Sequence, residues 1–309
     1  MTKSVIQPLE SLRLIQYATP VPCFICGTDN TIDAEFCTHC AAPMALAHQV
    51  GKRKIRPQMI AVTGAANVGK TVYLGMLIDM LSRQPDRLQL LARGAFSITL
   101  QQTTIAALSR CEFPRKTPNE PDRWNWVHCE VRRPKQRKPM ELIMPDMAGD
   151  AVLQEVDHPH TYRVIRAFLK RCTAAMILID APELKDDNRD QDYFTLKLLS
   201  YLGELGDGTS SAIWRNRPVA LVLTKADQCE ECLDDPAGFA EDHAPGLWQH
   251  CKERLVRHRF FAAGVAGGCA AYDTFTEGRV RVPLRIEPCG IIEPFQWLLD
   301  QTAQQPEKR

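Results

Sequence analysis

A glycine-bounded loop that ends in lysine and threonine is the first feature of this chain that could do chemistry. Residues 64–71 have the spacing Gly-x-x-x-x-Gly-Lys-Thr of a phosphate-binding loop. In such a loop, backbone amides and the positive end of the following helix surround a phosphate group. The lysine reaches the outer phosphates, and the threonine hydroxyl is a ligand for Mg²⁺. The residues predicted to contact a nucleotide here are Gly64, Ala65, Ala66, Asn67, Val68, Gly69, Lys70 and Thr71.

The segments on either side of this loop have the patterns that its function requires. Residues 60–63 form a short apolar, β-branched run, which predicts a buried strand. After the loop, apolar residues recur with the period of a half-buried helix over residues 71–83. Strand, glycine-bounded loop and helix in this order form the context of a functional phosphate loop. The sequence therefore predicts a nucleotide-binding protein.

A second candidate site follows another apolar run. Residues 141–144 predict a strand, and the segment Asp146-Met-Ala-Gly149 follows it closely. A carboxylate at the end of a strand beside the first one can take part in Mg²⁺ binding, and a flexible glycine lets its amide approach a terminal phosphate. An alternating run at 124–131 precedes this strand, so we expect an antiparallel hairpin with the basic turn 132–138 at its tip.

A third motif, Thr224-Lys-Ala-Asp227, follows the apolar run 218–223. The carboxylate of Asp227 can accept hydrogen bonds from the N1–H and N2–H₂ groups of guanine. Adenine lacks donors at both positions and would leave an acceptor unpaired. The aliphatic part of Lys225 can lie along the plane of the base. The segment therefore predicts a preference for guanine, with Thr224, Lys225 and Asp227 at the base.

Four cysteines near the N-terminus have the spacing of a structural metal site. Cys23-x-x-Cys26 and Cys37-x-x-Cys40 supply four thiolates, the ligand set of tetrahedral Zn²⁺. His39 lies inside the second pair and is interpreted as a bystander, because four cysteines already complete the site. The segment resembles the short zinc ribbons of many bacterial multidomain proteins, whose usual role is docking to protein or nucleic acid. So small a module depends on its metal to fold.

A third Cys-x-x-Cys comes directly after the guanine motif, at Cys229 and Cys232. His243, His250 and Cys251 lie downstream and could complete a second metal site. Because no second pair of this spacing accompanies it, we prefer the interpretation that these are two loop thiols.

The composition is that of an ordinary globular protein. The chain has 309 residues, of which 45% are hydrophobic and 24% charged, with a formal net charge of +1. This length can bury a large core, and so small a charge gives no overall field that favours nucleic acid or membrane. No apolar run reaches bilayer length, and residues 1–10 lack a signal-peptide core. We therefore expect a cytoplasmic protein whose cysteines are thiols or metal ligands.

We expect five segments along the chain. They are an N-terminal arm, a zinc ribbon, a basic linker, a nucleotide-binding domain and a short tail, over residues 1–20, 21–45, 46–57, 58–304 and 305–309. Four basic residues lie within 52–56. The simpler interpretation of that run is a solvated linker, and the alternative is a contact with nucleic acid or acidic lipid.

Together, the three nucleotide motifs resemble the first, third and fourth signature motifs of the Ras-like, translation-factor-related P-loop GTPases. Threonine in place of asparagine at position 224 also occurs in Rho-like members. The likeness covers about residues 58–304, and within the superfamily the chain resembles the bacterial double-GTPase 2 group. It implies a three-layer α/β P-loop fold, with a mostly parallel sheet and one antiparallel strand. It also implies a molecular switch that binds GTP or GDP with Mg²⁺ and is read by a protein effector.

The same resemblance implies roles for individual residues. Thr71 and Asp146 would hold Mg²⁺. Thr117 would be the threonine of switch I, with Thr103 and Thr104 as competing candidates. The expected catalytic residues are Lys70, Thr117, Gly149 and Asp150.

The chain departs from the family pattern at three places. Asp150 stands where the family has a catalytic glutamine. A carboxylate cannot donate a hydrogen bond to the γ-phosphate while it positions water, so we expect slow or partner-assisted hydrolysis. The fifth motif is degenerate, with Ala266 as the candidate base contact. Switch I also carries an insertion.

Four alternatives stay open. Asn67 matches a position at which some of these GTPases hold K⁺, although an ordinary loop residue is the simpler interpretation. The protein could also be a scaffold that holds nucleotide without turnover, or a P-loop ATPase or kinase. Nucleic acid is a further candidate partner, through the ribbon and the basic linker.

Overall fold

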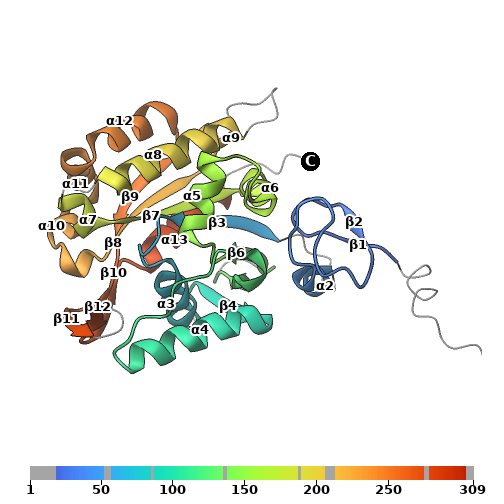
Figure 1. The fold of residues 1–309 in the computed structure, drawn as a ribbon, viewed down its shortest axis with the longest axis horizontal. Helices are drawn as coiled ribbons and strands as arrows, with labels where there is room; N and C mark the ends of the chain where they lie inside the picture. The colour runs from blue at the N-terminus through green and yellow to red at the C-terminus, as the bar shows by residue number, and fades with distance from the viewer. Residues whose placement is uncertain are drawn as a thin grey trace, which may run out of the picture.

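The computed structural model describes residues 19–51, 57–84, 87–134, 138–186, 189–205, 213–274 and 278–303. A small N-terminal module lies beside a larger α/β domain (Figure 1). Most of the expected N-terminal arm and the basic run 52–56 lie outside the described residues. None of the helices in the described ranges combines the length and the apolar character that a bilayer crossing needs.

Seven strands form the central sheet in the order β4-β5-β6-β3-β7-β8-β9. They are β3 (Gln58–Gly64), β4 (Gln89–Arg93), β5 (Trp126–Arg132), β6 (Met140–Pro145), β7 (Ala174–Asp180), β8 (Val219–Thr224) and β9 (His258–Ala262). Strand β3 is parallel to both β6 and β7, and β8 and β9 continue in the same direction. Strand β5 is antiparallel to both its neighbours, β4 and β6. The sheet is therefore mostly parallel with one antiparallel strand, as expected.

The central strands are apolar along their whole length because helices cover both faces of the sheet. All seven residues of β7 are buried. In β3, Met59 and Ala61 belong to one hydrophobic core, and Ile60 and Val62 belong to the other. This alternation divides the domain into the three layers of a P-loop fold.

Helices form the two outer layers (Figure 1). One core contains α3 (Lys70–Ser82), α4 (Gly94–Ser109) and α13 (Ile292–Ala303). The other contains α5 (Gly149–Asp157), α6 (Arg163–Arg171), α8 (Arg189–Glu204), α11 (Pro236–His243) and α12 (Pro245–Arg254). The short helices are α7 (Ala181–Lys185), α9 (Ile213–Asn216) and α10 (Glu231–Asp234), with 3₁₀ turns η1 (Pro121–Arg123) and η2 (Ala226–Gln228).

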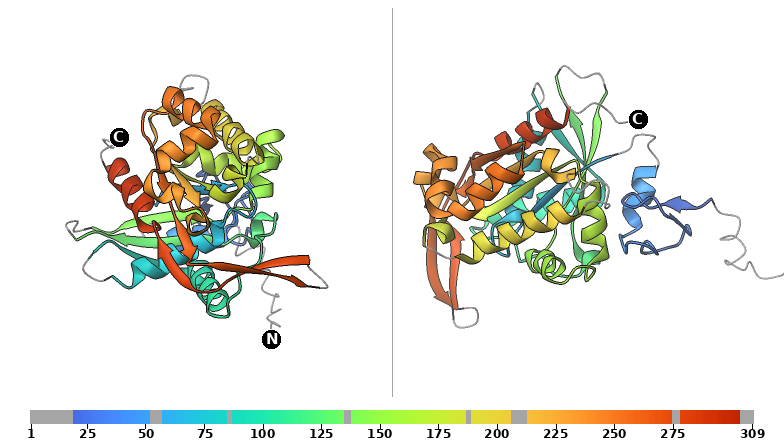
Figure 2. Two further views of the ribbon diagram at one scale, coloured as in Figure 1. Left: turned by 90° about the vertical axis from the view of Figure 1, so that its left-hand side faces the viewer. Right: turned by 90° about the horizontal axis from the view of Figure 1, so that it is seen from above.

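A pair of small antiparallel sheets follows the last strand of the central sheet. Strand β10 (Gly264–Ala266) pairs with β13 (Ile286–Cys289), and between them β11 (Cys269–Thr274) pairs with β12 (Gly278–Pro283). The β11–β12 hairpin projects from the body of the domain (Figure 2).

The N-terminal module consists of β1 (Val21–Pro22), β2 (Asp29–Asn30) and α2 (Ala45–Gly51). Helix α2 occupies part of the segment expected as linker. The module shares one continuous hydrophobic core with the α/β domain. In that core the ring of Phe24 meets the edge of Trp126 at 5.5 Å between centroids, and Trp126 meets Phe168 of α6 at 6.0 Å.

Candidate functional site

The carboxyl ends of three parallel strands bring the sequence motifs to one edge of the sheet. Gly64 ends β3, Asp146 follows β6, and Thr224 ends β8. Because ligands of open α/β sheets bind at this edge, the motifs lie where a nucleotide site is expected.

The phosphate loop curves around the first turn of α3. Asn67 and Gly69 have positive φ angles of 63° and 88°, which turn successive backbone amides toward a common centre. Lys70 is 6% exposed, and its Nζ donates hydrogen bonds to the carbonyls of Gly64 at 3.0 Å and Ala65 at 2.7 Å. Burial lowers the pKa of Lys70 to about 8. The loop thus presents amides and one buried ammonium, which fits a polyphosphate.

Three oxygen-bearing side chains meet beside this loop. Asp146 Oδ2 accepts hydrogen bonds from Thr71 Oγ1 at 2.9 Å and Thr117 Oγ1 at 3.1 Å, and the two hydroxyls are 3.0 Å apart. Asp146 is fully buried, which raises its pKa, and its Oδ1 has no hydrogen-bond partner among the described residues. Hard oxygen ligands around a buried carboxylate fit Mg²⁺.

The structure places Thr117, and neither of its two competitors, at this cluster. Thr103 lies on α4 and bonds to the carbonyl of Thr99 at 2.8 Å. Thr104 is buried against Gly75 of α3.

A candidate base cavity lies between the phosphate loop and the segments after β8 and β9, and Thr224, Lys225 and Asp227 line it. Burial raises the pKa of Asp227, and its Oδ2 is buried without a hydrogen-bond partner in the described part of the chain. An acceptor in this state fits the paired N–H donors of guanine. Gly264 lies so close to it that an added Cβ would stand 2.6 Å from Asp227 Oδ1.

The neighbouring contacts refine three expectations. The amide of Val265 donates a hydrogen bond to the carboxylate of Asp227, whereas Ala266 only lines the cavity. The ammonium of Lys225 forms an ion pair with Asp180, so that its charge is compensated while its side chain borders the cavity. Thr224 Oγ1 donates to the carbonyl of Ile179 at 3.1 Å, which is a structural role.

A second cavity adjoins the first and shares Asn67, Gly69 and Phe113 with it. The loop around Thr117 and the start of α5 enclose it. Gly149 lies directly against the phosphate loop, because an added Cβ would stand 2.4 Å from the amide of Ala66.

The residue after Gly149 has a partner that the sequence did not suggest. The Nζ of Lys116 is 2.5 Å from Asp150 Oδ2, and both side chains are partly exposed at this mouth. Arg281 of β12 also lines the base cavity and donates a hydrogen bond to Gln228 at 3.1 Å. No motif spacing points to Lys116 or Arg281, so sequence patterns could not have found them.

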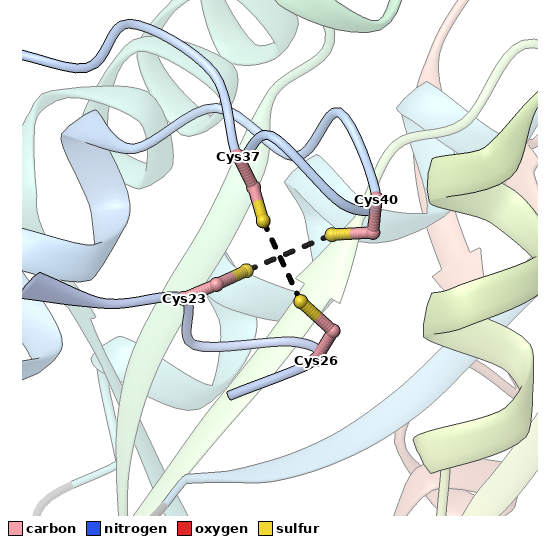
Figure 3. A group of neighbouring side chains, drawn as sticks. All are labelled: Cys23, Cys26, Cys37 and Cys40. Atoms are coloured by element: carbon pink, nitrogen blue, oxygen red, sulfur yellow. Dashed lines mark hydrogen bonds between the residues drawn. The ribbon is translucent and has the colours of Figure 1, made fainter. Parts of the chain in front are cut away.

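The four N-terminal cysteines converge on one point (Figure 3). Their Sγ atoms lie within 4.8 Å of one another, with 3.7 Å between Cys23 and Cys40 and 3.5 Å between Cys26 and Cys37. Four sulfurs at the usual Zn–S distance would be about 3.8 Å apart in a tetrahedron. The hydrogen bond between the Cys23 and Cys40 side chains lowers the pKa of Cys23 to about 5. The donor set therefore fits zinc.

No comparable group forms around Cys229 and Cys232. Among the described residues, the N-terminal cysteines are the only cluster with metal-ligand geometry. The thiol of Cys232 bonds instead to the carbonyl of Cys229 at 3.0 Å.

Comparison with known proteins gives one family match. The family model for double-GTPase 1 matches residues 61–213, which contain the phosphate loop and Asp146 but end before Asp227. The match supports the double-GTPase resemblance, and its subgroup is 1 where the motifs suggested 2. A search of curated proteins finds no match.

Several solved structures align with most of this chain at low identity. A nucleolar GTP-binding protein 1 from Plasmodium falciparum is 12% identical, with a TM-score of 0.41, over 80% of this chain and 87% of that one. A SAR1-type small COPII coat GTPase from Encephalitozoon cuniculi in complex with GDP is 13% identical, with a TM-score of 0.38, over 80% of each chain. The Arl6 small GTPase from Trypanosoma brucei is 12% identical, with a TM-score of 0.37, over 81% of this chain and 99% of that one.

Phosphate loop, buried carboxylates and family match lead to one conclusion: this chain carries a GTP-binding domain of the P-loop GTPase type, and it resembles the double-GTPases.

Proposed function

We propose that the protein is a GTP-dependent molecular switch with slow or partner-assisted hydrolysis. The observation that carries the proposal is the hydrogen bonding of Thr117 to Thr71 and Asp146, because it ties the loop of residues 112–125 to the phosphate loop. A loop held at the site of the terminal phosphate is expected to be ordered by GTP and released with GDP. A protein effector would read that ordering.

Guanine would be selected by Asp227. Its unpaired Oδ2 offers an acceptor that only a base with matching donors can satisfy. Lys70 would hold the phosphates, and the amide of Gly149 would approach the terminal one. Mg²⁺ bound at Thr71 and Asp146 would neutralise charge between the phosphates.

Thermal unfolding in the presence of GDP or ADP tests this base preference. At saturating nucleotide we expect GDP to raise the melting temperature by about 5 °C or more and ADP to have little effect. Asp227→Asn should bind GDP more weakly and reduce the GDP shift to a small remainder, and Asp234→Asn, at an exposed position on the next helix, should retain it in full. Equal shifts with ADP and GDP would favour the ATPase or kinase alternative.

The hydrolysis step would be unusual because of the pair formed by Lys116 and Asp150. With Lys116 beside it, the carboxylate that replaces glutamine is partly compensated, and an ammonium lies at the mouth of the phosphate cavity. A cation at that place can stabilise charge that develops on the phosphates. The need for bound K⁺ near Asn67 would then be small.

Single-turnover hydrolysis of GTP tests this step. We expect a slow Mg²⁺-dependent rate that Lys70→Ala removes and that is equal in K⁺ and Na⁺ buffers. A rate that rises in K⁺ would instead assign the cation role to a bound ion. If neither buffer supports turnover while GTP binds, the protein is the non-hydrolysing scaffold.

We place the nucleotide-binding domain at residues 58–304 and the ribbon at 21–45, with zinc held by its four cysteines. The ribbon is proposed as a docking module. Docking to nucleic acid, together with the basic run 52–56, is the alternative that a salt-dependent gel shift would reveal.

A further inference from the structure

The ribbon lies against the segment that follows the Thr117 loop. The ring of Phe24, between the first two cysteines, packs at 5.5 Å and 84° on Trp126, the first residue of β5. Arg163 of α6 adds a hydrogen bond to the carbonyl of His39 at 3.3 Å. Both contacts bind the two cysteine pairs to the α/β domain.

Trp126 and its neighbour Trp124 hold the loop in place. Both side chains are 1% exposed. The indole N–H of Trp124 donates to the carbonyl of Pro118 at 2.9 Å, and that of Trp126 donates to the carbonyl of Pro121 at 3.3 Å. Pro118 directly follows Thr117, so the two indoles fix the path of the loop just beyond its hydroxyl.

The segment around Trp126 also contacts the buried residue Asp146. Trp126 pairs across the sheet with Pro145, and the amide of Asp146 donates to the carbonyl of Asn125 at 2.9 Å. A displacement of Trp126 would therefore disturb both the loop and the position of Asp146.

From these contacts we propose that the metal-bound ribbon braces the Thr117 loop, with Phe24 and Trp126 as positioning residues, so that zinc occupancy sets the preference for GTP over GDP. The proposal rests on the switch function proposed above. If the loop is ordered before binding, the free-energy cost of ordering it no longer opposes the binding of GTP. GDP does not require the loop to be ordered, so its affinity is unaffected. Without metal the ribbon unfolds, and Trp126 loses the ring that covers it.

The first test needs no nucleotide. Hydrogen exchange is measured on the full chain with and without a zinc-selective chelator, in excess Mg²⁺. We expect the hydrogen-bonded amides of Arg123, Trp124 and Asp146 to exchange about tenfold faster or more after zinc removal, while β7, which lies in the centre of the sheet, is unchanged. Unchanged exchange at these three amides would overturn the proposal.

The second test compares affinities for a non-hydrolysable GTP analogue and for GDP. Phe24→Ala should weaken the analogue about five- to tenfold and GDP less than about twofold. Phe36→Ala is the matched control, because Phe36 lies on the same ribbon and is 43% exposed, and it should behave as wild type. Chelation should reproduce the Phe24→Ala effect in wild type and add nothing in the variant.

Two further variants separate positioning from folding. Trp126→Phe keeps an aromatic ring but removes the N–H that Pro121 accepts, and should give a smaller loss of the same kind. Phe24→Leu should restore part of the preference if Phe24→Ala folds poorly. Equal weakening of both nucleotides would make the contact merely structural. If wild type fails to prefer guanine nucleotides, the switch proposal fails, while the exchange experiment still decides on the brace.

Discussion

Asp227 combines a raised pKa with an oxygen that has no hydrogen-bond partner among the described residues. Its carboxylate receives the amide of Val265, and burial raises its pKa above the ordinary value. The ligand-free fold therefore loses stability as the pH rises through that pKa, because the buried carboxylate must then ionise. Guanine N–H donors stabilise the ionised form, so binding should release a proton when the pH lies near it.

We predict that affinity for GDP falls as the pH is lowered from about 7 toward about 4.5. The fall should begin at a higher pH than protonation of an exposed aspartate would cause. Calorimetry in two buffers of different ionisation enthalpy measures the proton released. Asp227→Asn serves as the control for titration of the phosphates, because any pH dependence that it retains belongs to the nucleotide. The same pH dependence in both proteins would contradict the role given to this carboxylate.

Residue type and spacing were enough to name Lys70, Asp146 and Asp227 as candidates, because each stands at a defined place after an apolar strand. Val265 could not be distinguished from Ala266, since the hydrogen bond comes from a backbone amide that residue type does not reveal. Lys116 was missed for a different reason, because the fold alone brings it next to Asp150, which lies far from it in the sequence.

Helix α5 begins at Gly149, where it touches the phosphate loop. A Cβ there would stand 2.4 Å from the amide of Ala66 and 2.5 Å from the carbonyl carbon of Ala65. Both are backbone atoms, so no side chain can move aside to make room. The loop and the helix are therefore coupled by contact.

Gly149→Ala should lower the free energy of unfolding by about 1–3 kcal/mol and weaken nucleotide binding. Gly203→Ala, in α8, is the matched control, since nothing lies within 4 Å of its added Cβ. That change should stabilise the fold by up to about 1 kcal/mol. Urea denaturation of both variants measures the difference. An unchanged free energy of unfolding in Gly149→Ala would show that the phosphate loop can move away from the added methyl group.

Most elements of the domain were predictable from periodicity. The strand at 60–63 and the hairpin formed by β5 and β6 were expected at nearly the observed positions. Strand β4 was missed, because an edge strand with one partner carries little apolar pattern. No pattern indicated that the chain leaves the central sheet after Ala262, where β10 pairs with β13 instead.

At the scale of the whole molecule, the ribbon and the α/β domain share one core. Phe24 and Trp126 meet across more than a hundred residues of chain. No local pattern encodes such a contact, so the motifs predicted both parts but not their packing. The ribbon thus packs on the α/β domain of its own chain.

We predict that zinc removal lowers the melting temperature of the whole protein by about 5–10 °C, because the unfolded ribbon no longer covers the domain core. Differential scanning calorimetry with the zinc-selective chelator and excess Mg²⁺ measures the shift. A single transition should persist. Two separate transitions in the zinc-bound protein would show that the ribbon and the domain unfold independently.

The shared core also has a consequence for synthesis. Phe24, Met44 and Leu46 are buried in it together with Trp126 and Phe168. A ribosome makes the first three long before the last two, so the newborn ribbon carries an uncovered apolar face while translation continues. Metal loading in that interval would give the nascent chain a folded end whose apolar face stays exposed to solvent until α6 has been synthesised.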